Sequence, residues 1–312
     1  MNRILISGSV AYDRIMDFDG FFRDHFLPEK LHNINVSFSV AAPAQEFGGT
    51  AGNIAYTLAL LEEKASIIAT VGSDFSEYRK HLDATGVDAS LIAVRHDLPT
   101  ASAYIMTDRG DNQITAFSAG AGALAYGNDL PRETIALGIV APSCVSDMLI
   151  LPDYFRRMKV PHFYDPGQQI TVLDGDQLKA GIDGATAVFA NDYELSLIGS
   201  KTGWGEKEIA ERVEALMVTY GAEGSRIVTK GGEARIPAVT ATHVADPTGA
   251  GDGYRAGFAK GFLAQLPFEV CAKLGSCAAA YVVERRGTQN HGFTLGEFRK
   301  RFQAAYGEAC PI

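Results

Sequence analysis

Residues 246–258 read Asp246-Pro-Thr-Gly-Ala-Gly-Asp252-Gly-Tyr-Arg-Ala-Gly-Phe258. The small residues from Gly249 to Gly251 leave backbone N–H groups uncovered, and a helix is expected to follow over about residues 252–265. Its apolar stripe at helical spacing is Phe258, Phe262 and Leu266. Uncovered N–H groups at a helix start form an anion site, and Asp252 beside a bound phosphate is placed to accept a proton from a hydroxyl. The ordinary alternative is that Asp252 only caps the first turn of the helix.

On either side of this stretch, short apolar runs alternate with longer helical patterns. The predicted strands are Arg3–Ser7, Ser66–Val71, Phe163–Tyr164, Ala187–Ala190 and Arg226–Thr229. A helix is predicted over Gly52–Glu63, because Ile54, Leu58 and Leu61 recur at i, i+4 and i+7. This alternation predicts an α/β fold with a mostly parallel sheet that helices cover on both faces.

Two stretches depart from this pattern because they alternate apolar and polar residues. In Asn33–Val40 the apolar positions are Ile34, Val36, Phe38 and Val40. Ala103–Ser118 is typical of a hairpin with its turn at 108–112. Such strands suit a sheet with one wet face, so we expect a small separate sheet, built as a lid from two insertions. Edge strands of the main sheet are the alternative.

Composition excludes several classes of partner. The chain has 312 residues and a formal net charge of −9, which argues against nucleic-acid polymers and anionic membrane surfaces because both need a basic footprint. No apolar run reaches the roughly 20 residues of a membrane span, and the N-terminus lacks the pattern of a signal peptide. We therefore expect a cytoplasmic protein. Glycine is abundant, with 33 residues, and its clusters indicate turns where the backbone approaches a ligand closely.

Four elements in order resemble the ribokinase-like (PfkB) family of small-molecule kinases, over nearly the whole chain. They are Gly48-Gly-Thr-Ala-Gly-Asn-Ile-Ala55, Asn191-Asp-Tyr-Glu194, Thr229-Lys-Gly-Gly232 and Asp246-Pro-Thr-Gly-Ala-Gly-Asp252. The resemblance implies a ribokinase-like three-layer α/β/α domain over residues 1–312, with a mostly parallel central sheet. It also implies a small β-sheet lid formed by about residues 13–47 and 99–119.

The resemblance also implies roles for individual residues. Asp252 is expected as the catalytic base, with the amides of Gly249, Ala250 and Gly251 as the anion hole for the transferred phosphoryl group. The residues expected to bind the acceptor substrate are Asp13, Gly49, Asn53, Asn112 and Gln113. Those expected around ATP and Mg²⁺ are Asn191, Glu194, Thr229, Gly231 and Thr248. Glu194 is expected to hold Mg²⁺ through water, and Asp246 to help bind a monovalent cation such as K⁺.

Within the family, three further segments resemble the bacterial and archaeal adenosine or nucleoside kinases. They are Thr107–Gln113, Asp165–Gln168 and Gly253–Phe258, and Val283–Gln289 adds to the resemblance. The implied reaction is ATP-dependent phosphorylation of the 5′-hydroxyl of a nucleoside, with adenosine favoured and the lid positions Val36 and Phe38 covering the base. The alternatives are a sugar kinase acting on ribose or fructose, and a non-catalytic nucleoside-binding protein. The lid strands also suit pairing in a homodimer.

A dinucleotide-binding oxidoreductase is a remote alternative. Gly120-Ala-Gly-Ala-Leu-Ala125 fits G-x-G-x-x-A, but a true fingerprint opens a helix in the first βαβ unit. Tyr126-Gly-Asn-Asp-Leu-Pro131 would end such a helix within one turn, so we expect no dinucleotide site there.

Overall fold

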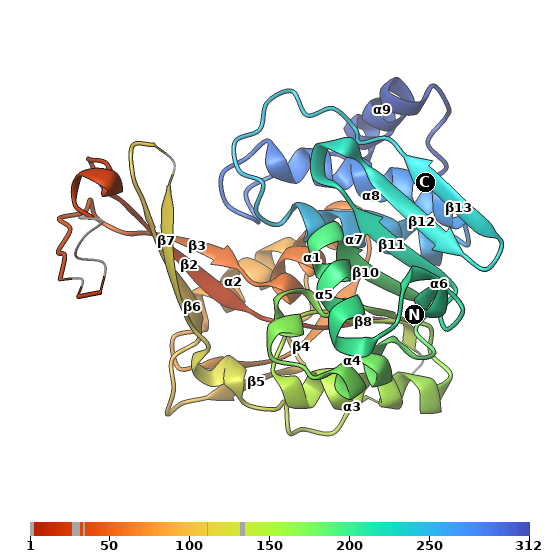
Figure 1. Ribbon diagram of the computed structural model, residues 1–312, viewed down its shortest axis with the longest axis horizontal. Helices are drawn as coiled ribbons and strands as arrows, with labels where there is room; N and C mark the ends of the chain where they lie inside the picture. The colour runs from red at the N-terminus through yellow and green to blue at the C-terminus, as the bar shows by residue number, and fades with distance from the viewer. Residues whose placement is uncertain (1–2, 27–31, 34, 111, 132–134) are drawn as a thin grey trace.

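The computed structural model describes residues 3–26, 32–33, 35–110, 112–131 and 135–312. Within these residues the chain forms a nine-stranded sheet between helices and a four-stranded sheet that extends away from it (Figure 1). The predicted mostly parallel sheet and the separate small sheet are both confirmed.

The large sheet has the strand order β13-β12-β11-β10-β9-β8-β1-β4-β5. In chain order its strands are β1 (Arg3–Ser7), β4 (Ala65–Gly72), β5 (Ile92–Arg95), β8 (Ile135–Val140), β9 (His162–Tyr164), β10 (Ala187–Asn191), β11 (Ala215–Thr219), β12 (Ser225–Thr229) and β13 (Gly232–Ile236). All neighbouring pairs are parallel except β11–β12 and β12–β13. The carboxyl ends of the parallel strands therefore meet along one edge.

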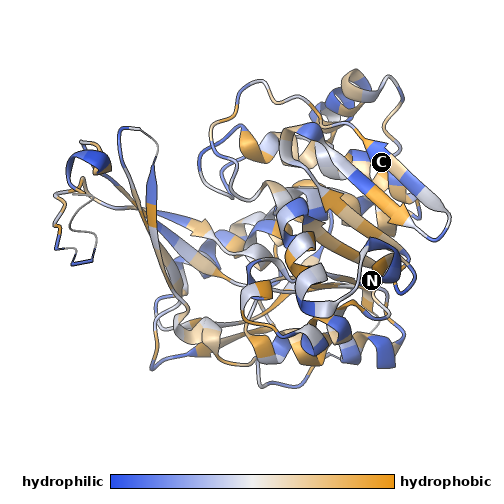
Figure 2. Ribbon diagram, viewed as in Figure 1, coloured by the Kyte–Doolittle hydropathy of each residue, from blue (hydrophilic) through white to orange (hydrophobic). Residues whose placement is uncertain are grey.

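Helices cover both faces of this sheet because successive side chains of a strand point to opposite faces. Ile4 and Ile6 pack in one core cluster while Leu5, between them, packs in the other. The first face carries α1 (Thr50–Leu60), α2 (Ser76–Thr85), α7 (Ala250–Leu263) and α8 (Phe268–Val283), and the second α3 (Val145–Met158), α4 (Gly175–Ile182), α5 (Asp192–Thr202) and α6 (Glu206–Ala210). The final helix, α9 (Leu295–Tyr306), packs on α8. Figure 2 shows the hydrophobic residues gathered along the central strands.

The small sheet has the order β3-β2-β6-β7 and forms the lid. Its strands are β2 (Ala11–Asp17), β3 (Ala44–Gly48), β6 (Ala101–Thr107) and β7 (Gln113–Ser118). The hairpin predicted over Ala103–Ser118 is confirmed as the antiparallel pair β6–β7. In the part of the chain that the structure describes, no helix has the length and apolar character that crossing a membrane requires.

The strand expected over Asn33–Val40 is not formed in its described part. Ile34 lies outside the described residues, and of the rest only Val40 makes a bridge, to Phe18. Burial still alternates along 35–40, because the half-buried residues face an aromatic cluster instead of a neighbouring strand. Phe38 packs edge-on against Phe18 with ring centroids 4.8 Å apart, and against Phe22 at 5.3 Å. The alternation of apolar and polar residues thus indicates that one side of this segment is covered. Here that side is covered by side-chain packing and not by pairing with a neighbouring strand.

Candidate active site

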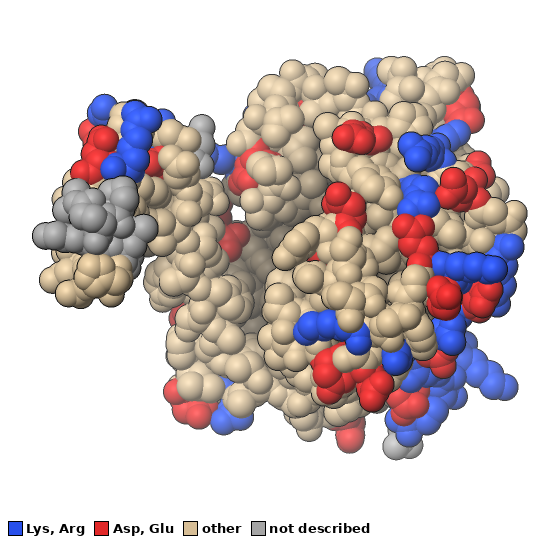
Figure 3. All heavy atoms as spheres, in the orientation of Figure 1, with Lys and Arg blue, Asp and Glu red and all other residues tan. Residues whose placement is uncertain are grey.

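A cavity of about 520 Å³ opens at the carboxyl edge of the large sheet, where ligands of open α/β sheets bind. Asp165, Asn191 and Thr219 enter it from the ends of β9, β10 and β11. The starts of α1 and α7 close its far side, and Phe117 of the lid strand β7 reaches it from above. Figure 3 shows the hollow between the lid and the body of the molecule, with acidic side chains at its rim.

The start of α7 carries the segment expected to bind an anion. Gly249 precedes the helix with φ +78°, a left-handed conformation that favours glycine, and this turn leads into the helix at Ala250. The Ala250 N–H lies 3.3 Å from the Pro247 carbonyl, in a turn. Within the described residues, the N–H groups of Gly251 and Asp252 have no acceptor. Two donors at the positive end of the helix dipole are therefore available to an anion.

Asp252, in the first turn of α7, is almost completely buried and lines the cavity. Its Oδ2 accepts a hydrogen bond of 2.8 Å from the amide nitrogen of Asn53, on α1. Burial raises the pKa of Asp252, while the Arg255 guanidinium and the Asn53 hydrogen bond oppose that rise. A carboxylate with a raised pKa in a cavity is suited to accept a proton.

Arg255 and Asp165 form a buried ion pair beside Asp252, and their pairing is a feature that sequence reasoning missed. Arg255 Nε lies 2.5 Å from Asp165 Oδ2, and the two side chains are 13% and 3% exposed. A Cβ at Gly251 would lie 2.5 Å from Arg255 Nη1, so glycine is needed there for the guanidinium to reach the anion site. The available signal was the position of Asp165 directly after a parallel strand, at the edge where ligands bind.

Asp13 lies on β2, at the base of the lid, and lines the cavity together with Gly49 and Asn53. Burial and the carboxylates of Asp246, Glu46 and Asp252 raise the pKa of Asp13 to about 6. Gly48 must lack a side chain, because its Cβ would lie 2.4 Å from Asp13 Oδ2. The three predicted acceptor-binding residues are thus brought together within reach of Asp252.

Asn191 and Glu194 also line the cavity, and they cap the start of α5. Asn191 Oδ1 accepts the Glu194 N–H at 2.7 Å, and Glu194 Oε2 accepts the Asn191 N–H at 2.8 Å. This capping box leaves Oε1 of Glu194 for other partners. In the described residues no three His, Cys, Asp or Glu side chains cluster as a metal site. The donor set fits Mg²⁺ held mainly by water and phosphate oxygens, as that ion prefers.

The loop between β13 and α7 carries Asp246 and Thr248. Asp246 accepts the main-chain N–H groups of Thr248 at 2.9 Å and Gly287 at 3.3 Å, which ties this loop to the segment after α8. Thr248 lines the cavity, whereas Asp246 is not among its lining residues. The monovalent-cation role of Asp246 therefore stays a prediction.

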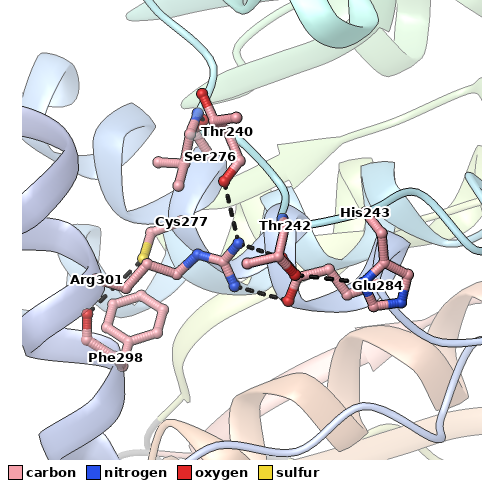
Figure 4. A network of polar contacts seen from close by, with 9 residues as sticks. Thr240, Thr242, His243, Ser276, Cys277, Glu284, Phe298 and Arg301 are labelled. Atoms are coloured by element: carbon pink, nitrogen blue, oxygen red, sulfur yellow. Dashed lines mark hydrogen bonds and ion pairs between the residues drawn. The ribbon is translucent and has the colours of Figure 1, made fainter.

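A second anchor of the same loop is the ion pair between Glu284 and Arg301 (Figure 4). Glu284 accepts hydrogen bonds from the N–H and hydroxyl of Thr242, and Arg301 donates to the carbonyl of Thr240. Burial alone would raise the pKa of Glu284, but the bonds from Arg301 and Thr242 lower it to about 2. These contacts hold the loop between β13 and α7 in the position that places Gly249 at the cavity.

Thr229 and Gly231, which were expected at the nucleotide site, are not brought to the cavity. β12 runs antiparallel to β11, with Leu216 opposite Val228, so Thr229 lies at the edge opposite the carboxyl ends of the parallel strands. Thr229 and Gly231 only form the turn of the β12–β13 hairpin. The loop at the active edge instead follows β11, where Thr219 and Gly221 line the cavity. The segment Thr219-Tyr-Gly221-Ala-Glu-Gly224 offered the same threonine-and-glycine signal.

Asn112 and Gln113 are not brought to the cavity. The amide of Asn112 donates to both carboxylate oxygens of Asp108, at 3.0 and 3.1 Å, within the hairpin turn, and Gln113 is exposed at the start of β7. Val36 and Phe38 do not line it either. The lid residue that reaches it from β7 is Phe117, which is 61% exposed.

A second cavity, of about 690 Å³, adjoins the first and shares Ser9, Phe117, Pro142 and Gln168 with it. Its other walls are largely apolar and include Ile68, Leu124, Val145 and Val172. The segment Gly120–Ala123 forms a single 3-10 turn beside it, and the next element among the described residues is the strand β8, so this segment does not open a helix there. The two cavities together form one elongated site with a polar and an apolar end.

Comparison with known proteins gives likenesses along nearly the whole chain. A family model described as pfkB family carbohydrate kinase matches residues 1–293. The nucleoside kinase of Methanothermobacter thermautotrophicus is 31% identical over 315 residues, which cover 99% of this chain and 98% of that protein. The solved structure of Burkholderia thailandensis nucleoside kinase with inosine has a TM-score of 0.88 and 40% identity, covering 98% and 99% of the two chains. The Methanocaldococcus jannaschii nucleoside kinase, an archaeal member of the ribokinase family, has a TM-score of 0.88 and 28% identity, covering 97% and 99%.

Proposed function

Because this chain belongs to the pfkB family of carbohydrate kinases, we propose that it is an ATP-dependent nucleoside kinase that phosphorylates the 5′-hydroxyl of its substrate. We further propose adenosine as a preferred acceptor. The Burkholderia thailandensis relative has been solved with inosine and with ADP-inosine, which supports a nucleoside together with an adenine nucleotide as ligands.

One observation carries the choice of a nucleoside over a bare sugar. The polar cavity that holds Asp13, Asn53 and Asp252 continues into a largely apolar cavity of about 690 Å³. A ribose fits the polar part through hydrogen bonds to its hydroxyl groups, and a nucleobase needs an apolar slot of the kind that the second cavity offers. Ribose or fructose would leave that second cavity unused.

In the proposed reaction Asp252 accepts the proton of the 5′-hydroxyl while the hydroxyl oxygen forms its bond to the γ-phosphorus of ATP. The bond between that phosphorus and the β,γ-bridging oxygen breaks, and ADP leaves with the electron pair. The N–H groups of Gly251 and Asp252, with the Arg255 guanidinium, stabilise the charge on the phosphoryl oxygens. Asp13 and Asn53 orient the sugar. Thr219, Gly221 and Thr248 lie where the nucleotide enters.

Magnesium, when bound with ATP, supplies charge neutralisation of the phosphates. Glu194, through water, is the residue of this chain proposed to hold it, because Oε1 of that side chain is not used by the helix cap. A K⁺ requirement, a homodimer formed through the lid and a cytoplasmic location belong to the same proposal. The exposed edge strand β7 supports the dimer.

An ADP-release assay across acceptors tests this proposal. Adenosine, inosine and cytidine are compared with ribose and fructose at equal concentration, and nucleosides are expected to give the higher kcat/KM. Asp252→Asn is the matched inactive form. Because only proton acceptance is lost, its kcat is expected to fall about 10²- to 10⁴-fold, while calorimetry should still detect nucleoside binding. Turnover of ribose or fructose without turnover of any nucleoside would show a sugar kinase instead. A near-normal kcat in Asp252→Asn would show that Asp252 is not the catalytic base.

A further inference from the structure

A chain of buried polar side chains leads away from Asp252 into the body of the molecule. Its members come from four separate segments: Asp252 on α7, Asn53 on α1, Thr288 and Gln289 after α8, and Tyr78 and His81 on α2. Asn53, Thr288, Gln289 and Tyr78 are each at most 5% exposed. Buried polar groups at this depth need every partner, so the direction of each hydrogen bond can be worked out.

The chain is anchored at a main-chain carbonyl, which can only accept. The Tyr78 hydroxyl lies 2.7 Å from the Gly48 carbonyl and must donate its single proton there. The Tyr78 oxygen therefore acts as acceptor toward Gln289, 2.5 Å away, so the NH₂ group of Gln289 faces Tyr78. The amide oxygen of Gln289 then faces His81 and accepts from its Nε2 at 3.0 Å.

This orientation of Gln289 determines the orientation of Asn53. The second N–H of Gln289 points at Asn53 Oδ1, 3.0 Å away. The Thr288 hydroxyl lies 2.8 Å from the same oxygen and 3.1 Å from the Phe47 carbonyl, so its single proton is shared between two acceptors and Gln289 is the donor that decides the orientation of Asn53. The NH₂ group of Asn53 is thereby left to face Asp252 Oδ2, at 2.8 Å. Rotating the Asn53 amide by half a turn would place its oxygen against the Asp252 carboxylate and its NH₂ group against the NH₂ of Gln289. Both contacts would be repulsive.

We propose that Gln289 is a positioning residue for the proton-accepting carboxylate: by fixing the Asn53 amide it ensures that Asp252 is met by a hydrogen-bond donor. The role rests on the proposed kinase function, and Gln289 acts through Asn53 without lining the cavity itself. The donor stabilises the ionised form of Asp252 and so opposes the rise in its pKa that burial causes.

Other charged groups also affect the pKa of Asp252, so a test of Gln289 requires a variant that leaves them in place. Arg255 on the same helix favours its ionised form. Two carboxylates interact electrostatically with Asp252: Asp165 at the end of β9 and Asp13 on β2. Glu194 on α5 interacts in turn with Asp165 and Arg255. Burial lowers the pKa of His81 at the far end of the chain, and also that of His291 beside Thr57, so both are neutral at pH 7. Gln289→Met leaves the charged groups in place and removes only one hydrogen-bond acceptor of His81, which Gln289→Glu retains.

The test compares wild type with Gln289→Met, which has a similar size and no donors. Gln303→Met, exposed on α9, is the matched control. In Gln289→Met the acid limb of the pH profile of kcat is expected to move about one pH unit higher. The kcat at pH 7 falls several-fold and returns toward the wild-type value at pH 9, with a smaller change in KM for adenosine. Gln289→Glu keeps the acceptor for His81 and is expected to move the limb in the same direction.

A role that is only structural would lower kcat equally at every pH, and that result, or an unchanged acid limb, would overturn the proposal. A second readout needs no activity: ¹³C NMR titration of labelled aspartate carboxyls, with Asp252 assigned by its loss in Asp252→Asn. The pKa of Asp252 is expected to rise in Gln289→Met and to stay unchanged in Gln303→Met. An inactive wild type would refute the kinase function, whereas an unchanged Asp252 pKa would refute the positioning role.

Discussion

Asp13 is a carboxylate that the folded chain keeps in an unfavourable place. It is half-buried and faces three other carboxylates, which together with burial raise its pKa to about 6. A residue that serves only stability would not be placed so, and strained electrostatics of this kind concentrate at functional sites. The same reasoning applies to Asp252, whose burial is compensated by Asn53 and Arg255.

Asp13→Asn is therefore expected to raise stability while lowering activity. The folded state binds the Asp13 proton more tightly than the unfolded state, so stability falls as pH rises from about 4 to about 6, and the loss persists above that window. At pH 7.5 the variant should gain up to about 3 kcal/mol of unfolding free energy, and most of the gain should be lost near pH 4. Chemical denaturation at both pH values measures this.

Asp17→Asn, at the exposed end of the same strand, is the control and should change little at either pH. The kcat/KM for nucleoside should fall in Asp13→Asn only. A variant less stable than wild type at pH 7.5 would contradict the interpretation.

At the scale of the secondary-structure element, the direction of a strand determines at which edge of the sheet its carboxyl end lies. β11 and β12 are neighbours of similar composition, but β11 runs parallel to β10 and β12 runs against it. Thr219 at the end of β11 therefore faces the cavity, and Thr229 at the end of β12 lies at the opposite edge. Local sequence does not distinguish the two, because each is a strand followed by a threonine and a glycine-containing turn.

Thr219→Tyr and Thr229→Tyr form a matched pair that tests this assignment. A tyrosine at 219 would fill the space proposed for the nucleotide, and KM for ATP is expected to rise about tenfold or more, equivalent to about 1.4 kcal/mol. A tyrosine at 229 adds the same group at a hairpin turn, so KM for ATP should stay at the wild-type value. Steady-state kinetics with ATP varied at saturating nucleoside give the answer, and equal effects in the two variants would argue against it.

At the scale of the whole molecule, the site lies where the lid meets the edge of the large sheet. β7 pairs with β6 in the lid, and its Phe117 borders both cavities, which are otherwise lined mainly from the large domain. The apolar end and the polar end of the elongated site thus meet beneath one lid side chain.

Phe117→Ala is expected to raise KM for nucleoside about three- to tenfold, the range of a lost aromatic contact, and to leave KM for ATP unchanged. Ile114→Ala is the control, because Ile114 lies on the same strand with its side chain on the other face. A comparison of adenosine with ribose sharpens the test, since ribose lacks the base that Phe117 would cover. An equal loss for ribose would argue against the base-binding role.

The sequence by itself determined the alternating architecture, the hairpin of the lid and the start of α7, because these depend on local periodicity and on small residues at a helix start. The family resemblance extended this to Asp13, Gly49, Asn53 and Asp252, which the fold does bring together in one cavity. Only the tertiary structure decided the rest. The pairing of Arg255 with Asp165, the place of Thr219 instead of Thr229, and the fixed amide of Asn53 all depend on contacts between segments far apart in the chain. Periodicity reports the environment of one segment, whereas strand direction and buried hydrogen-bond partners arise only when several segments pack together.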